Sequence, residues 1–165
     1  MYITFEQFCT LYDPIEEILF NRLSFDAERL MDNHTTGVDG IKKLRAAFPT
    51  DEYAVAAVMH CAGSIVNLLN QIYKAEQAAE KGRGYTETAQ GLQRKIISRV
   101  EAGNEAISYS ETKLTNSSID AAVADKSVRD ALIASTIKEY LSGVTDANGV
   151  GLLYMGSYPR GYAHV

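Results

Sequence analysis

The chain has 165 residues, 46% of them hydrophobic and 22% charged, which is the composition of one ordinary globular domain. Its formal net charge is −5, and this acidic balance gives no support to a surface that binds nucleic acid or an anionic membrane. The first residues lack the basic start and apolar core of a signal peptide, and no apolar run approaches the ~18 residues of a membrane span.

The N-terminal third predicts three short helices. Thr4 is a suitable N-cap for a helix over 5–12, and Asp13-Pro14 predicts the start of a second helix. A third helix is expected over about 39–48, where Pro49 closes it. The second helix should bury one stripe of apolar residues that recur three and four positions apart: Ile15, Ile18, Leu19, Leu23, Ala27, Leu30 and Met31.

The strongest helical pattern begins at Thr50 and continues to about Lys81. Asp51 and Glu52 lie in its first turn, where the helix dipole favours acidic side chains. Thirty residues at 1.5 Å each make a helix of ~45 Å, which should be the scaffold for the shorter helices. Its apolar face is Val55, Val58, Ala62, Ile65, Leu69 and Ile72.

After a glycine-rich break over 82–91, the period of the sequence changes to that of strands. Gly103-Asn104 predicts a tight turn, so we expect a β-hairpin near 94–110. That turn pairs Val100 with Ile107 and Ser98 with Tyr109. Two more helices are expected, over about 118–125 and 127–142.

The last segment, 145–165, is rich in glycine and yet apolar, with two leucines and three tyrosines. Glycines and Pro159 exclude a helix, so we expect an extended arm that buries itself against its own core or a neighbouring chain. The predicted fold is mainly α, with short helices around one long central helix, one inserted hairpin and this arm. We therefore expect a helical domain over 1–144 and an arm over 145–165.

The chain shows no constellation typical of an enzyme. His34, His60 and His164 lie in unrelated settings, and no phosphate loop, dinucleotide fingerprint or nucleophile motif is present. We therefore expect no enzyme activity, no catalytic residue, no cofactor and no metal site. Cys9 and Cys61 are widely separated and favour small core residues in a reducing compartment over a disulfide. One compact basic cluster exists: Lys42, Lys43 and Arg45.

The order of these elements resembles the head-tail connector proteins of tailed bacteriophages, also called head-completion or adaptor proteins or DNA-packaging connectors. The resemblance covers nearly the whole chain and is closest to prophage members of gut Firmicutes. Related tails often carry an arginine after the tyrosine, whereas this chain has Met155. The pieces that carry the resemblance are Tyr2-Ile3-Thr4, Ala27–Thr36, Gly82–Thr88, Glu139–Val144 and Leu152–Gly156.

The resemblance implies a structural protein of the virion, present in the bacterial host cytoplasm during assembly. It implies a homo-oligomeric ring below the portal that closes the packaged capsid and docks the tail. Its partners would be further copies of itself, the phage portal protein and a tail-side joining protein, with no membrane partner. DNA would pass through the ring without specific binding, which suits an acidic chain.

The arm and the hairpin are the expected assembly contacts, because a ring former needs two different surfaces on each subunit. Three alternatives stay open: another assembly or tail-side joining protein, a small helical regulator that binds DNA, and an unrecognised enzyme. The candidate contact residues are Leu152, Leu153, Tyr154, Gly156 and Tyr158 in the arm, and Arg99, Gly103 and Asn104 in the hairpin.

Overall fold

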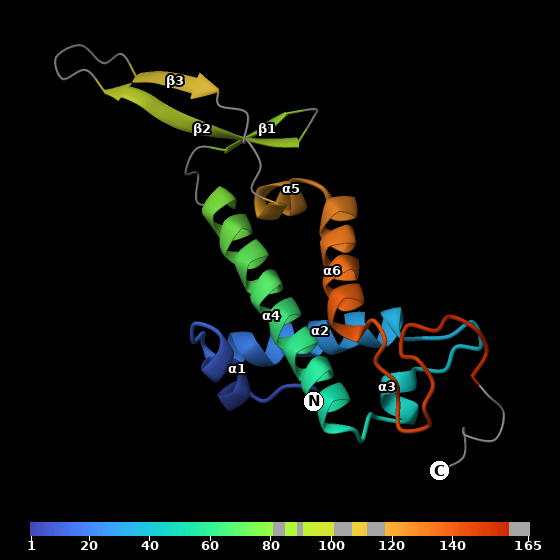
Figure 1. Cartoon of the computed structure of the whole chain (residues 1–165). Coiled ribbons are helices and arrows are strands. Elements are labelled where there is room, and N and C mark those ends of the chain that lie inside the picture. The colour runs from blue at the N-terminus through green and yellow to red at the C-terminus, as the bar shows by residue number, and fades with distance from the viewer. Residues whose placement is uncertain (81–84, 89–90, 101–106, 112–117, 159–165) are drawn as a thin grey trace. The chain divides into compact units, whose positions relative to one another are not determined.

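The computed structural model describes residues 1–80, 85–88, 91–100, 107–111 and 118–158, with side chains described for 1–77 and 118–158. This part of the chain is mainly helical and contains one long central helix, as predicted (Figure 1). It divides into two units, one formed by Met1–Leu69 with Ile133–Val165 and the other by Asn70–Leu132.

Helix α1 (Phe5–Leu11) begins after Thr4, as the sequence predicts. The Gln7 N–H donates to Thr4 Oγ1 at 3.2 Å, and the Thr4 N–H donates to Gln7 Oε1 at 2.9 Å. These two bonds form a capping box, which satisfies backbone donors at the start of the helix. Helix α2 (Glu17–His34) has Glu16 as its N-cap and no side-chain cap, so the predicted start at Asp13-Pro14 is wrong.

The buried face of α2 contradicts the predicted stripe at Ile18. Ala27 and Met31 are fully buried, as predicted, whereas the Ile18 side chain is 85% exposed. Ala27 follows Ile18 by nine residues, a rotation of about 180° at 3.6 residues per turn, so the two side chains lie on opposite faces. Phe20 occupies the core in place of Ile18.

Helix α3 (Lys43–Ala46) is shorter than the predicted span of 39–48. Helix α4 (Glu52–Glu80) has 29 residues, close to the predicted length. The Asp51 carboxylate accepts a 3.0 Å hydrogen bond from the Ala54 N–H, so Asp51 rather than Thr50 caps this helix.

The core of the first unit combines side chains from its helices with Leu152 and Tyr158 of the C-terminal segment. The Phe8 and Phe20 rings lie 5.4 Å apart between α1 and α2. Burial of such large side chains is the main force that holds short helices together. The largest fully buried apolar side chains of this core are Phe8, Phe20, Met31, Leu44, Val58, Ile65, Val66, Ile137, Leu141 and Leu152.

One stretch of α4, Glu52–Gln77, is long and apolar enough to cross a membrane, contrary to the expectation from the sequence. The buried core helix of a water-soluble protein can have the same length and composition. Val58, Ala62 and Ile65 of this stretch are buried in the core of the first unit. Length and composition alone are therefore weak evidence that this stretch of α4 spans a membrane.

In the second unit, helix α5 (Ser118–Ala124) and the start of helix α6 (Lys126–Leu141) accompany the end of α4. Arg129 Nη1 lies 3.0 Å from Glu76 Oε1 and so links α6 to α4. Both helices lie within two residues of their predicted bounds. Gly143 follows the end of α6 and has a φ of +78°. Glycine adopts this left-handed conformation at low cost, and a residue in this conformation ends a helix.

Three antiparallel strands complete the second unit: β1 (Tyr85–Thr88), β2 (Gly91–Val100) and β3 (Ile107–Glu111). They form one sheet in the order β1-β2-β3. The predicted turn at Gly103-Asn104 lies outside the described residues, so the hairpin connection stays a prediction.

The register of β2 and β3 agrees with the prediction at one pair and differs at the other. Val100 pairs with Ile107, as predicted, but Tyr109 pairs with Ile97 rather than with Ser98. An irregularity between Ile97 and Arg99 shifts the register by one residue. A bulge of this kind leaves one residue unpaired, which turn chemistry alone does not reveal.

The burial of α4 and α2 gives a matched test. Ile65→Ala should lower the free energy of unfolding by ~2–5 kcal/mol, because Ile65 is fully buried. Ile18→Ala should change it by less than ~0.5 kcal/mol, because Ile18 is exposed. Chemical denaturation measures both values, and similar losses for the two variants would contradict the assigned faces.

The buried Cys61 thiol should make the stability of the fold depend on pH in the alkaline range. Burial raises the pKa of Cys61 from 9.0 to about 12, so its stabilising contribution is complete below pH 9 and declines as the pH rises toward 12. The contribution of Cys61 to the unfolding free energy should therefore fall above pH 9, with a slope approaching ~1.4 kcal/mol per pH unit. Cys61→Ala should therefore show a shallower decline above pH 9 than the wild type, and an equal decline in the two proteins would show that the Cys61 thiol ionises in the folded protein.

Candidate functional site

The candidate site is the described part of the C-terminal segment, residues 145–158, which folds back on itself. Thr145 and Gly151 form an antiparallel bridge, and the Leu152 N–H donates to Val144 O at 2.9 Å. The Asp146 carboxylate accepts bonds from the backbone N–H groups of Asn148 and Val150, both at 2.9 Å. The described part of the predicted extended arm is therefore a closed loop.

This loop packs on its own unit beside α3, as Figure 1 shows for the red and teal segments. Leu152 is fully buried and Tyr158 is 4% exposed. The predicted separation of an arm from a domain over 1–144 is corrected accordingly, because residues 145–158 contribute to the core of the first unit. Burial of these two side chains explains part of the apolar composition of the segment.

Lys43 holds the loop from the side of α3. Its side chain is fully buried, and Nζ donates to Leu152 O at 3.3 Å and to Tyr154 O. Nζ also lies 5.6 Å from the centre of the Tyr154 ring. Burial lowers the pKa of Lys43, while the carboxylates of Asp146 and Asp39 oppose this change.

A second set of polar contacts fixes the far end of the loop. The Tyr158 hydroxyl donates to Asp146, and Asn148 Nδ2 donates to the Tyr158 oxygen at 2.9 Å. The Tyr158 N–H donates to Asp39, and this bond is the main cause that lowers the pKa of the Asp39 carboxyl. Tyr158 is thus tied both to the buried Asp146 carboxylate of the loop and to the exposed Asp39 carboxylate outside the loop.

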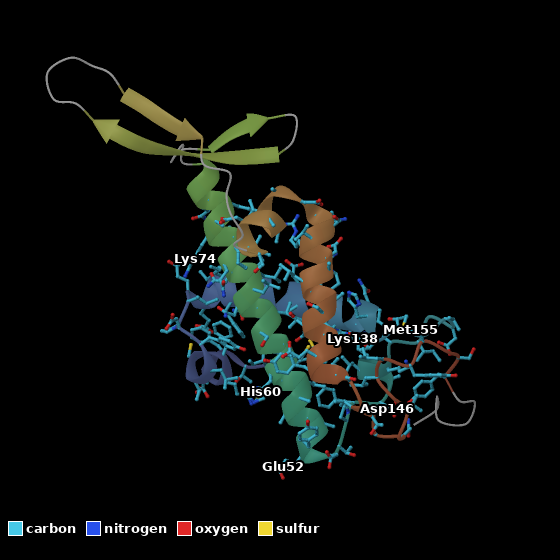
Figure 2. The ribbon with its side chains drawn as sticks, turned by 45° about the horizontal axis from the view of Figure 1, so that its top comes forward. Glu52, His60, Lys74, Lys138, Asp146 and Met155 are labelled. Carbon is cyan, nitrogen blue, oxygen red and sulfur yellow. The ribbon has the colours of Figure 1, made fainter. Side chains whose placement is uncertain are left out.

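Between these anchors the loop presents two large side chains to solvent. Tyr154 and Met155 are each 54% exposed, and Figure 2 shows Met155 at this loop. The Val38 N–H donates to Met155 O at 3.1 Å, and the Val38 side chain is 76% exposed. We call Val38, Tyr154 and Met155 the C-terminal patch.

The predicted contact residues of the segment divide into buried and exposed positions. Leu152 and Tyr158 are core residues, so they are corrected from surface contacts to anchors. Leu153 is half-buried against the core, and Tyr154 is exposed. Gly156 lies directly beneath the Tyr154 ring.

In the predicted hairpin, the Arg99 backbone pairs with Ser108, and nothing is described of its side chain. Gly103 and Asn104 lie outside the described residues. Sequence reasoning missed Val38, although an apolar residue directly after Thr36-Gly37 at a helix end was a usable signal.

The compact basic cluster is largely neutralised. Lys43 is buried in the contacts above. Arg45 Nε donates to the buried Asp32 carboxylate, which raises the pKa of Arg45, and Arg45 Nη2 lies 3.5 Å from Glu28. Of the three cluster residues, Lys42 alone is exposed without a described ion pair. The cluster therefore does not present three free cations to a ligand.

Among the described side chains, no group of three or more His, Cys, Asp or Glu residues could hold a metal ion. His60 is half-buried on α4 (Figure 2). Comparisons with protein-family models, curated proteins and solved structures found no match to this chain.

Gly156 offers a way to move Tyr154 without disturbing the fold. A Cβ at position 156 would collide with the Tyr154 ring, which is exposed enough to swing aside, whereas a Cβ at Gly151 would meet its nearest atom at 3.8 Å. Gly156→Ala should keep a melting temperature within a few degrees of the wild type but lose the NMR contacts between the Tyr154 ring and Lys43. Gly151→Ala should keep both, and an unchanged Tyr154 signal in Gly156→Ala would refute this packing.

Proposed function

We propose that the protein is a head-tail connector of a tailed bacteriophage, a structural virion component that forms a ring below the portal. In this role it closes the packaged capsid and provides the docking surface for the tail. The observation that carries the proposal is the Leu152–Gly156 motif of the family, which this chain displays on a firmly anchored loop. A rigid display of apolar side chains lowers the entropic cost of binding a partner.

The residues of this motif differ in burial, and we assign them different roles accordingly. Leu152 anchors the loop, while Tyr154 and Met155 are available to the portal. Aromatic and methionine side chains are enriched at protein interfaces, so this pair suits a protein partner. The usual arginine is replaced by Met155, so the proposed portal contact at this position is apolar rather than charged.

The hairpin near 94–110 is proposed as a further extension toward a neighbour in the assembly. The antiparallel backbone pairing of β2 with β3 supports this geometry. Arg99, Gly103 and Asn104 remain the proposed contact residues of that extension. The remaining proposed partner is a tail-side joining protein, and the protein would act in the host cytoplasm before it becomes part of the virion.

The neutralised basic cluster favours passage of DNA over binding of DNA. A regulator that grips duplex DNA needs several Lys or Arg side chains on one surface. In this chain Lys43 is buried and Arg45 is engaged by Asp32 and Glu28. We therefore propose that DNA passes through the ring without specific contacts and that the protein is not an enzyme.

Deletion of the gene from its phage tests the proposal. We expect DNA-filled heads and separate tails that do not join, visible by electron microscopy, and restoration of infectious particles by the wild-type gene. Gly156→Ala should restore joining poorly, because it displaces Tyr154. Gly151→Ala, the matched control, should restore it fully. If the phage without the gene formed normal particles, the proposal would be overturned. If its heads and tails joined but then separated easily, a tail-side role would be favoured.

A further inference from the structure

The C-terminal loop contains the dipeptide Asn148-Gly149, the one place in the chain where a glycine follows an asparagine. In such a dipeptide the backbone nitrogen of the glycine can attack the asparagine side chain, because glycine has no Cβ to obstruct the approach. Gly149 is exposed, and a Cβ added there would meet no heavy atom within 4 Å, so water has free access to it. The reaction that these groups allow is deamidation of Asn148, with water as the further reactant.

Deamidation at this dipeptide proceeds in two steps. First, the Gly149 nitrogen forms a bond to the carbonyl carbon of the Asn148 side chain, and the bond from that carbon to Nδ2 breaks. The Gly149 nitrogen loses its proton, and Nδ2 leaves with that proton as ammonia. Water then opens the resulting cyclic imide at either of its carbonyl groups, which gives aspartate or isoaspartate at position 148. Either product carries a negative charge where the amide was neutral.

Hydrogen bonds of the folded loop engage both of the reacting groups. The Gly149 N–H donates to Asp146 O at 3.0 Å, so the attacking nitrogen is already bonded. Asn148 Nδ2 donates to the Tyr158 oxygen at 2.9 Å, and this bond restrains the side chain that has to turn toward Gly149. Deamidation therefore requires these bonds to break, and its rate should follow the frequency with which the loop opens.

The product of the reaction could not restore the contacts of Tyr158. The Tyr158 hydroxyl has a single proton, which it donates to the Asp146 carboxylate. An ionised carboxylate at position 148 has no proton to donate to the Tyr158 oxygen, and it would lie close to the carboxylate of Asp146, which is buried. Like charges repel more strongly in a buried site than in water, so the reacted loop should hold Tyr158 less firmly.

We propose that Asn148 is a modification site whose deamidation is controlled by opening of the C-terminal loop and loosens that loop irreversibly. In the closed loop the site reacts slowly, because Gly149 and Asn148 are held by Asp146 and Tyr158. Each opening exposes the site to reaction, and a chain that has reacted closes less firmly. The change runs in one direction because the ammonia is lost to solution.

The rate of modification tests the control by the loop. Peptide mapping by mass spectrometry detects the gain of ~1 Da at Asn148 and the isoaspartate product. At mildly alkaline pH, the native full-length chain should deamidate at least ~10-fold more slowly than the same chain in concentrated urea. Tyr158→Phe lacks the hydroxyl that holds Asn148, so it should react several-fold faster than the wild type when native and equally fast in urea. Tyr154→Phe, at an exposed tyrosine of the same loop, is the control and should react like the wild type.

The effect of the product is tested without waiting for the reaction. Asn148→Asp carries the charge of the product from the start, whereas Asn148→Ala removes the amide and adds no charge. The Tyr158 amide, bonded to Asp39, should exchange its hydrogen faster in Asn148→Asp than in Asn148→Ala, while the Ile65 amide of α4 keeps wild-type protection in both. Equal deamidation rates in native buffer and in urea, a wild-type rate in native Tyr158→Phe, or full protection of the Tyr158 amide in Asn148→Asp would each overturn the inference.

Discussion

The buried ammonium group of Lys43 is the constraint on which the arrangement of the site depends. A desolvated cation is costly unless acceptors surround it, and those acceptors here are the carbonyl groups of Leu152 and Tyr154. Because α3 supplies the lysine and the C-terminal loop supplies the carbonyls, the loop cannot leave without stranding the charge. Burial of Leu152 in the apolar core adds to the same restraint.

This restraint connects the fold to the proposed role. With both ends anchored, the loop presents Tyr154 and Met155 on a fixed support rather than on a free arm. Among the described residues of the first unit, the C-terminal patch is the surface that this support presents to solvent. A partner protein that binds there would meet side chains whose positions are already fixed.

The sequence predicted that the helices exist because periodicity is a local signal, but it misplaced the start of α2 and the cap of α4. The role of Thr4 as the cap of α1 and the length of α4 both follow from the residue pattern. Which apolar residues of a helix enter the core depends on packing against other elements, which is not a local signal. For this reason the sequence assigned Ile18 to the wrong face of α2. Lys43 could not be found either, because a lysine beside Lys42 and Arg45 is typical of a solvated surface. Its burial depends on carbonyl groups more than a hundred residues away.

Amide hydrogen exchange of the C-terminal loop measures the central claim most directly. In the wild-type protein the Leu152 amide, bonded to Val144 O, and the Val38 amide, bonded to Met155 O, should exchange far more slowly than in an unfolded chain. In Lys43→Met, which leaves the two carbonyl groups without their donor, protection of both amides should fall, while amides of α4 such as Ile65 keep theirs. Unprotected Leu152 and Val38 amides in the wild type, or full protection in Lys43→Met, would contradict the account.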